Sequence, residues 1–114
     1  MAPEILRGEK YTSAADVYSF GVILWEMLTS EIPFKGRSIP HITGMVGYYK
    51  EKLKVPPQCS KGLRKIVNNC MLYEPERRPN FEHIVDFLNQ IEEEALQEES
   101  AKPKMVDKVY DFLY

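Results

Sequence analysis

The sequence predicts an all-α chain, on three observations. Apolar residues recur at helical spacing in several segments, and no segment shows the strict alternation typical of a β-strand. The composition is that of a globular chain, with 44% hydrophobic and 28% charged residues. The length of 114 residues allows one domain at most, so the helices are expected to share one core.

Residues 1–12 carry Pro and Gly with little periodicity, which predicts a loop. Ser13 followed by Asp16 forms a capping-box pattern, with Asp in place of the usual Glu or Gln. This pattern predicts a helix from Ser13 to about Thr29.

Apolar residues lie all the way round this first helix, which must then be buried on all sides. The remaining helices of so short a chain can hardly surround it, so we expect further sequence to pack around it. The residues concerned are Val17, Tyr18, Phe20, Val22, Ile23, Leu24, Trp25, Met27 and Leu28.

Two further helices are predicted after a loop that contains Pro33 and Phe34. Residues 39–53 predict a weak helix, because Gly44 and Gly47 lower its propensity. A stronger helix is capped by Ser60 and ended by Glu74-Pro75. Its apolar stripe consists of Leu63, Ile66, Val67, Cys70 and Met71.

The last predicted helix follows Pro79, with Asn80 as its cap. Residues 92–101 include five glutamates and predict a solvated tail, and the stretch from Val106 to Leu113 returns to a helical spacing. We therefore expect a domain at residues 1–95 and an acidic, then amphipathic, tail at residues 96–114, which either docks or begins a further element. The stripe of the helix consists of Phe81, Ile84, Val85, Leu88 and Ile91.

The net charge of −2 gives no overall attraction to nucleic acid or to a membrane. The charged residues are unevenly distributed along the chain. Residues 35–65 hold eight Lys or Arg and one acidic residue, and residues 66–114 hold five Lys or Arg and eleven acidic residues. The basic middle predicts either a surface for an acidic partner or simply a solvated face.

Cys59 and Cys70 are too few for a disulfide scaffold and match no zinc motif, and His41 and His83 add no ligand cluster. We expect two reduced thiols in a cytoplasmic protein. The N-terminus lacks the pattern of a signal peptide, and no apolar run is long enough to span a bilayer.

Three motifs in order resemble the distal end of a eukaryotic-type protein kinase domain. They are Met-Ala-Pro-Glu at residues 1–4, Asp-Val-Tyr-Ser-Phe-Gly-Val-Ile-Leu-Trp-Glu at residues 16–26, and Cys-Met-Leu-Tyr-Glu-Pro-Glu-Arg-Arg-Pro at residues 70–79. The resemblance covers roughly residues 1–92. It implies part of a kinase-like (α+β) C-lobe, from the end of the activation segment through the last helices. Met1 would then be an internal residue of a longer kinase.

The resemblance implies roles for four residues. Glu4 would pair with Arg78, since guanidinium meets a carboxylate with two hydrogen bonds; Arg77 is the alternative partner. Asp16 would brace the catalytic loop of a complete kinase, or only cap its own helix. Trp25 would be a core residue.

Tyr18 and Phe81 make the resemblance strongest to the tyrosine-kinase-like group of serine/threonine kinases. The catalytic motifs of kinases are missing from the chain: it contains no Gly-x-Gly-x-x-Gly, no His-Arg-Asp and no Asp-Phe-Gly. We therefore assign no catalytic, cofactor-binding or metal-binding residue, and expect this chain alone to be inactive. ATP and Mg²⁺ are implied only for a longer parent kinase, whose N-terminal part is missing here.

Three interpretations follow. The first is part of a serine/threonine protein kinase that phosphorylates proteins in signalling, with a protein substrate or docking protein near residues 35–54. The second is a non-catalytic binding module or truncated isoform that acts through the basic surface of residues 35–65. The third is an unrelated helical protein with chance matches. None of them predicts a nucleic-acid or membrane partner.

Overall fold

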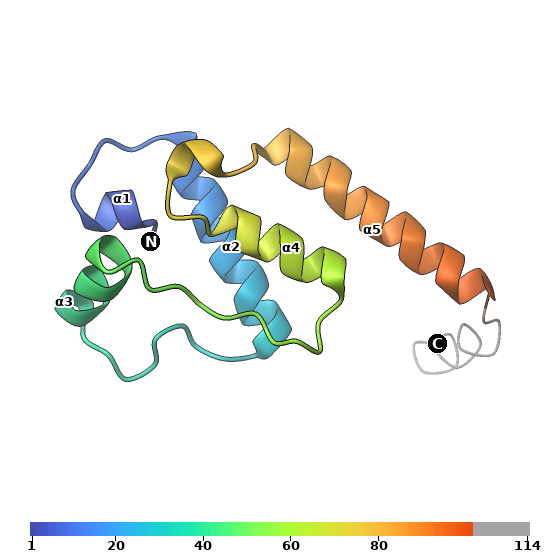
Figure 1. The fold of residues 1–114 in the computed structure, drawn as a ribbon, viewed down its shortest axis with the longest axis horizontal. Helices are drawn as coiled ribbons and strands as arrows, with labels where there is room; N and C mark the ends of the chain where they lie inside the picture. Colours follow the sequence, from blue (N-terminus) through green and yellow to red (C-terminus); the bar gives the residue numbers. More distant parts are fainter. Residues whose placement is uncertain (102–114) are drawn as a thin grey trace. The chain divides into compact units, whose positions relative to one another are not determined.

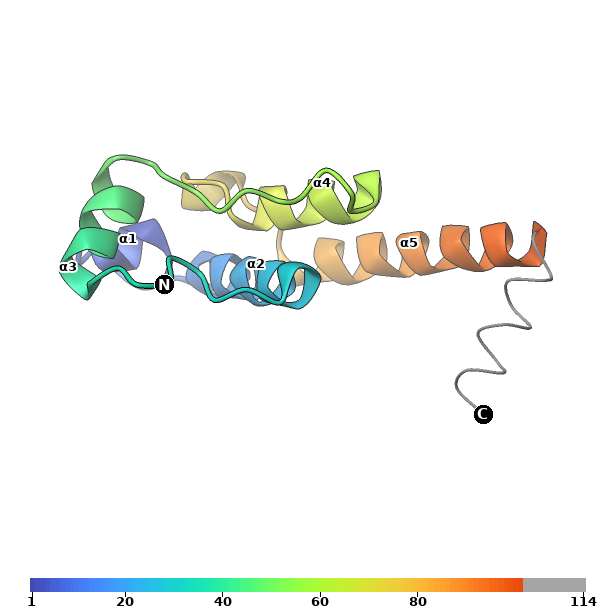
Figure 2. The same ribbon diagram turned by 90° about the horizontal axis from the view of Figure 1, so that it is seen from below.

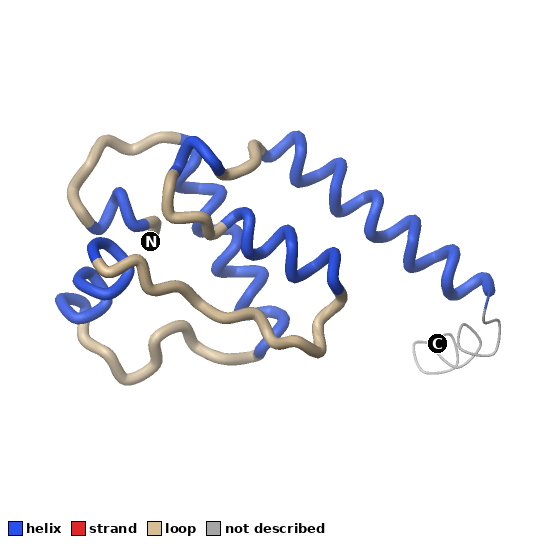
Figure 3. The backbone as a smooth tube through the Cα atoms, in the orientation of Figure 1, coloured by secondary structure: helices blue, strands red, loops and turns tan. Residues whose placement is uncertain are grey.

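The structure, a computed structural model, describes residues 1–101. Every regular element in this range is helical and none is a strand, which confirms the predicted all-α class (Figure 3). The described residues divide into residues 1–81 and a second compact unit that begins at Glu82. No helix within residues 1–101 is long and apolar enough to cross a membrane.

A short helix, α1 (Pro3–Leu6), lies inside the segment that the sequence predicted to be a loop (Figure 1). Pro3 stands in its first turn, where the missing N–H of proline costs nothing. The Arg7 N–H donates to the Pro3 carbonyl at 3.0 Å and closes the helix. Four residues are too few for a periodic pattern, which is why this helix was missed.

The central helix α2 spans Ser13–Thr29, as predicted. The predicted capping box is wrong: Ser13 is already helical, and the extended residue before it, Thr12, makes no side-chain capping bond. At the other end, Ser30 adopts a left-handed φ of 56° and donates its N–H to the Glu26 carbonyl at 2.8 Å.

One side of α2 packs against α4 (Lys61–Cys70), and the two helices lie side by side in both ribbon views (Figures 1 and 2). Gly21 permits this approach, because a Cβ placed there would lie 2.8 Å from the Cys70 Cβ. On α2, Ile23 is 53% exposed and Met27 is 72% exposed. The described residues therefore cover only part of this all-round apolar helix. Its buried members are Ala15, Val17, Tyr18, Gly21 and Trp25.

Residues 39–53 form a shorter helical segment than predicted. Helix α3 (Ile39–Ile42) runs directly into the π-helical segment η1 (Thr43–Tyr48), and the Ser38 hydroxyl accepts from the His41 N–H at 3.3 Å. The chain then leaves the helix because Lys50 takes a left-handed φ of 58°.

The Ser60 cap of α4 is confirmed, since its hydroxyl accepts from the Leu63 N–H at 3.2 Å. The helix ends at Cys70, before the predicted Glu74-Pro75, and a 3₁₀ turn, η2 (Pro75–Arg77), follows. The carbonyls of Leu72 and Tyr73, which lie between the two elements, accept from the Arg78 side chain.

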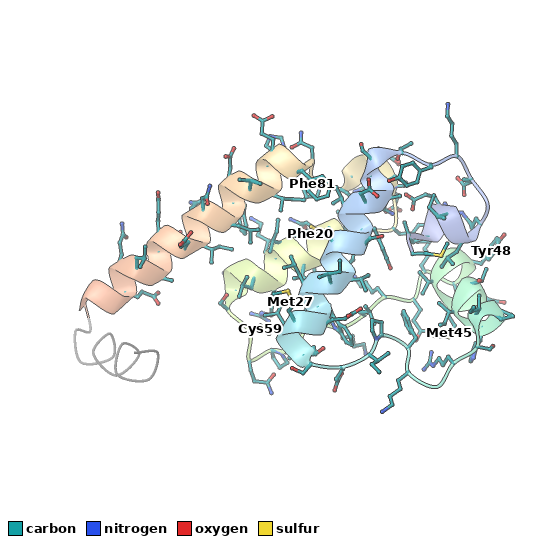
Figure 4. All side chains as sticks on the ribbon, turned by 180° about the vertical axis from the view of Figure 1, so that it is seen from behind. Phe20, Met27, Met45, Tyr48, Cys59 and Phe81 are labelled. Carbon is teal, nitrogen blue, oxygen red and sulfur yellow. The ribbon has the colours of Figure 1, made fainter. Side chains whose placement is uncertain are left out.

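Helix α5 (Phe81–Ala101) begins where it was predicted but continues through residues 92–101, where a solvated tail was expected. The Glu, Gln, Ala and Leu residues there are strong helix formers. The predicted tail from residue 96 is thus helical as far as Ala101, and its amphipathic part at residues 106–113 lies outside the described residues. The Phe81 ring packs edge-on against Phe20, with centroids 5.8 Å apart (Figure 4).

Candidate functional site

Glu4 and Arg78 form a buried ion pair at the centre of the first unit. One Arg78 Nη donates to Glu4 Oε2 at 2.7 Å and the other to Oε1 at 2.8 Å, so the contact is bidentate. The Glu4 residue is 3% exposed and Arg78 is 7% exposed. The partner of Glu4 is therefore Arg78, as the resemblance implied.

Every N–H of the Arg78 guanidinium has a partner. Besides its two bonds to Glu4, it donates to the carbonyls of Leu72 at 2.7 Å, Ala14 at 2.9 Å and Tyr73 at 3.1 Å. Since arginine has five N–H donors, none is left unsatisfied. The side chain thereby joins α1, the start of α2 and the segment that follows α4.

The ion pair and its burial shift two pKa values. Burial by itself disfavours ionised Glu4, but the hydrogen bonds and charge of Arg78 outweigh it, and the pKa of Glu4 is lowered. Tyr18 lies under the guanidinium, whose carbon is 5.0 Å from the ring centroid. Burial raises the pKa of Tyr18 to about 12, so this phenol stays neutral.

Arg77, the alternative partner, is placed elsewhere. Its side chain is 67% exposed and lies 3.8 Å from Glu74, an exposed pair worth little. Asp16 is exposed in the first turn of α2, where its carboxylate accepts from the Tyr11 hydroxyl and raises the pKa of that tyrosine.

Trp25 is a core residue, 6% exposed, and it also has a specific partner. Its indole N–H donates to the Lys54 carbonyl at 2.8 Å. This bond attaches the stretch that follows η1 to the central helix.

A second polar cluster was not predicted from the sequence. The Gly47 carbonyl accepts from the Tyr73 hydroxyl at 2.6 Å and from an Arg7 Nη at 3.0 Å. Arg7 also donates to the Tyr73 hydroxyl and pairs with Glu9. Gly47 was the available signal, since a Cβ there would lie 3.4 Å from the Leu6 Cβ, which indicates a close approach of backbone.

Within residues 1–101 there is no group of three or more His, Cys, Asp or Glu side chains placed to bind a metal. The buried thiol of Cys70 has a pKa raised to about 11 by burial, so it is not an activated nucleophile. The hydrogen bonds of the two clusters fix α1, the start of α2, η1 and the segment after α4 relative to one another.

A family model described as protein tyrosine and serine/threonine kinase matches residues 1–88. The chain belongs to the protein kinase family. The matched part of this kinase sequence contains both members of the Glu4–Arg78 pair.

Several curated kinases are similar to the chain. The "Probable serine/threonine-protein kinase drkC" of Dictyostelium discoideum is 42% identical over 84 residues, 74% of this chain and 11% of that protein. Human mitogen-activated protein kinase kinase kinase 11 is 35% identical over 98 residues, 86% of this chain and 12% of that protein. The serine/threonine/tyrosine-protein kinase HT1 of Arabidopsis thaliana is 36% identical over 93 residues, 82% of this chain and 24% of that protein. The aligned part is thus a quarter or less of each relative.

Proposed function

We propose that the protein to which these residues belong is a tyrosine-kinase-like serine/threonine kinase, which transfers phosphate from Mg-ATP to protein hydroxyls in signalling. The observation that carries the proposal is the match to the kinase family over residues 1–88, with relatives that are themselves serine/threonine kinases. The catalytic and ATP-binding groups would come from sequence that precedes Met1.

The residues of this chain would contribute rigidity rather than chemistry. Phosphoryl transfer depends on positioning reactants and charges, and a loosely placed group costs rate. Arg78, with all five donors satisfied, fixes α1 to α2 and to the end of α4. In the longer protein Asp16 would brace the catalytic loop through its exposed carboxylate.

The test begins with the transcript upstream of the Met1 codon. An open frame that encodes His-Arg-Asp and Asp-Phe-Gly supports the proposal, and the long protein should then phosphorylate casein in the presence of Mg-ATP. The 114-residue chain is the matched control and should transfer no phosphate. An in-frame stop directly upstream, or a long protein with these motifs and no transferase activity, would contradict the proposal and favour a non-catalytic binding module.

We also propose a protein-docking role for residues 35–54, where exposed aromatic and apolar side chains stand among basic ones. On α3 and η1, Ile39 is 77% exposed and Tyr48 is 61% exposed, and Tyr49, directly after η1, is 83% exposed. Exposed tyrosines are common anchors of protein interfaces. A Tyr49→Ala and Ile39→Ser double variant should lose partners captured by the unaltered chain, whereas Tyr11→Ala, an exposed tyrosine outside the region, should keep them.

The proposed location is the cytoplasm, which suits free thiols at Cys59 and Cys70. Imaging of the tagged protein in cells, together with fractionation, tests this. Enrichment in a secretory compartment would contradict it.

A further inference from the structure

A cavity of about 270 Å³ lies in the first unit, between the stretch that follows η1 and the segment that follows α4. Lys50 and Lys52 line it from one side, and Asn68, Tyr73 and Arg77 line it from the other. It is distinct from the exposed aromatic surface of α3 and η1, and from the buried Glu4–Arg78 pair.

The side chains that line the cavity carry a net positive charge, with Lys50, Lys52 and Arg77 against Glu51 and Glu74. Two carboxylates line it, but Glu51 lies 3.5 Å from Arg37 and Glu74 lies 3.8 Å from Arg77. Within the described part of the chain, no ion pair involves Lys50 or Lys52. Two lysines that line the same cavity thus have no ion pair in the described part of the chain.

The first of these lysines is placed by a strained backbone. Lys50 has a left-handed φ of 58°, which is unfavourable for a residue with a side chain. Its Nζ lies 5.1 Å from the centroid of the Tyr73 ring, and that ring is fixed by the hydrogen bond of its hydroxyl to the Gly47 carbonyl. The Lys50 ammonium therefore lies against a ring that is itself held in place at the cavity wall.

The backbone beyond Lys52, on the same side of the cavity, is also anchored. The indole N–H of Trp25 fixes the Lys54 carbonyl at 2.8 Å, which limits the movement of the stretch that carries Lys52. Asn68 and the guanidinium of Arg77 add N–H donors opposite the lysines. Lysine, asparagine and arginine residues with N–H donors thus line one cavity, a composition that suits an anion.

We propose that this cavity binds a phosphorylated serine or threonine side chain of a partner protein. A cavity of this volume is small for a whole drug-sized ligand, but it suits one side chain. A phosphomonoester carries nearly two negative charges at neutral pH, which matches two unpaired lysines better than a carboxylate does. The inference rests on the proposed docking role of residues 35–54 and names the chemistry of the partner.

The experiment measures fluorescence anisotropy of a fluorescein-labelled heptapeptide with one central phosphoserine among glycines, titrated with the 114-residue chain. The Lys50→Gln/Lys52→Gln variant should bind at least about tenfold more weakly, because two exposed charge contacts are removed. Lys35→Gln/Lys61→Gln removes the same charge outside the cavity and should bind like the unaltered chain. Lys50→Arg/Lys52→Arg should retain binding.

Four outcomes would overturn the inference: equal binding of the unphosphorylated peptide, equal binding of a peptide with glutamate at the centre, full competition by inorganic phosphate at the same concentration as the phosphopeptide, or an equal loss in the control variant. Far-UV circular dichroism checks that each variant folds. Should the double variant fail to fold, Lys52→Gln alone carries the test, since its exposed side chain has no ring contact. Peptide binding is measured without ATP, so it does not depend on kinase activity. The Tyr49→Ala/Ile39→Ser variant should bind the phosphopeptide like the unaltered chain, which separates anion binding at the cavity from docking at the aromatic surface.

Discussion

Arg78 contacts Glu4 across 74 positions of sequence through two hydrogen bonds of 2.7 and 2.8 Å. The pair lies at the point where α1, the start of α2 and the end of α4 converge, because Arg78 also donates to backbone carbonyls of the last two segments. It therefore serves as a tertiary cross-link as much as an ion pair.

Removal of either partner should destabilise the chain strongly. Arg78→Gln and Glu4→Gln should each lower the free energy of unfolding by roughly 3–5 kcal/mol, because each leaves a buried charge unpaired. Urea unfolding followed by circular dichroism measures this. Arg77→Gln, at the exposed neighbour, should cost less than about 1 kcal/mol. An equal loss of unfolding free energy in Arg77→Gln and Arg78→Gln would contradict Arg78 as the partner of Glu4.

The same pair predicts a pH dependence. The pKa of Glu4 is lowered in the folded state, so its ionised form stabilises the fold above the unfolded pKa of about 4.3. That contribution is lost as the pH falls through the folded pKa. The difference in unfolding free energy between the unaltered chain and Glu4→Gln should therefore shrink in acid. A difference that stays constant from about pH 7 to pH 3 would rule out this linkage.

Gly21 should resist substitution because α4 lies against it. Gly21→Ala places a Cβ 2.8 Å from the Cys70 Cβ and 2.9 Å from the Met71 Cγ, so we expect a loss of roughly 1–3 kcal/mol from overpacking. Gly44→Ala is the matched control, since nothing lies within 4 Å of a Cβ there, and it should be neutral or stabilise by up to about 1 kcal/mol. Thermal unfolding of both variants separates the cost of overpacking between α2 and α4 at Gly21 from the general effect of replacing a glycine by alanine. A neutral Gly21→Ala would contradict the close approach.

Tyr73→Phe should loosen the second polar cluster. The substitution removes the hydroxyl that donates to the Gly47 carbonyl at 2.6 Å and accepts from Arg7. The expected cost is about 1–2 kcal/mol, measured by urea unfolding, since both former partners are partly buried. Tyr49→Phe changes an 83% exposed tyrosine and should cost nothing measurable. A Tyr73→Phe chain as stable as Tyr49→Phe would show that the cluster contributes no stability.

Local signals were sufficient for the long helices. Helical spacing located α2 and the start of α5, and the Ser60 cap located the start of α4, because an apolar stripe and a capping bond each act within a few residues of sequence. The kinase motifs were likewise visible as strings of residues, and the family membership they implied is confirmed.

The sequence by itself determined the all-α class and the family, and it reduced the partners of Glu4 to Arg78 or Arg77. Only the tertiary structure decided between these two arginines, where α4 ends and what surrounds the helices. Beyond the end of α4 at Cys70, the carbonyls of Leu72 and Tyr73 accept from Arg78, whose guanidinium is held by Glu4, 74 positions away in sequence. The segment after η1 turns at Lys50, which stands over the Tyr73 ring. These choices depend on partners brought close by folding, so no local pattern contains them.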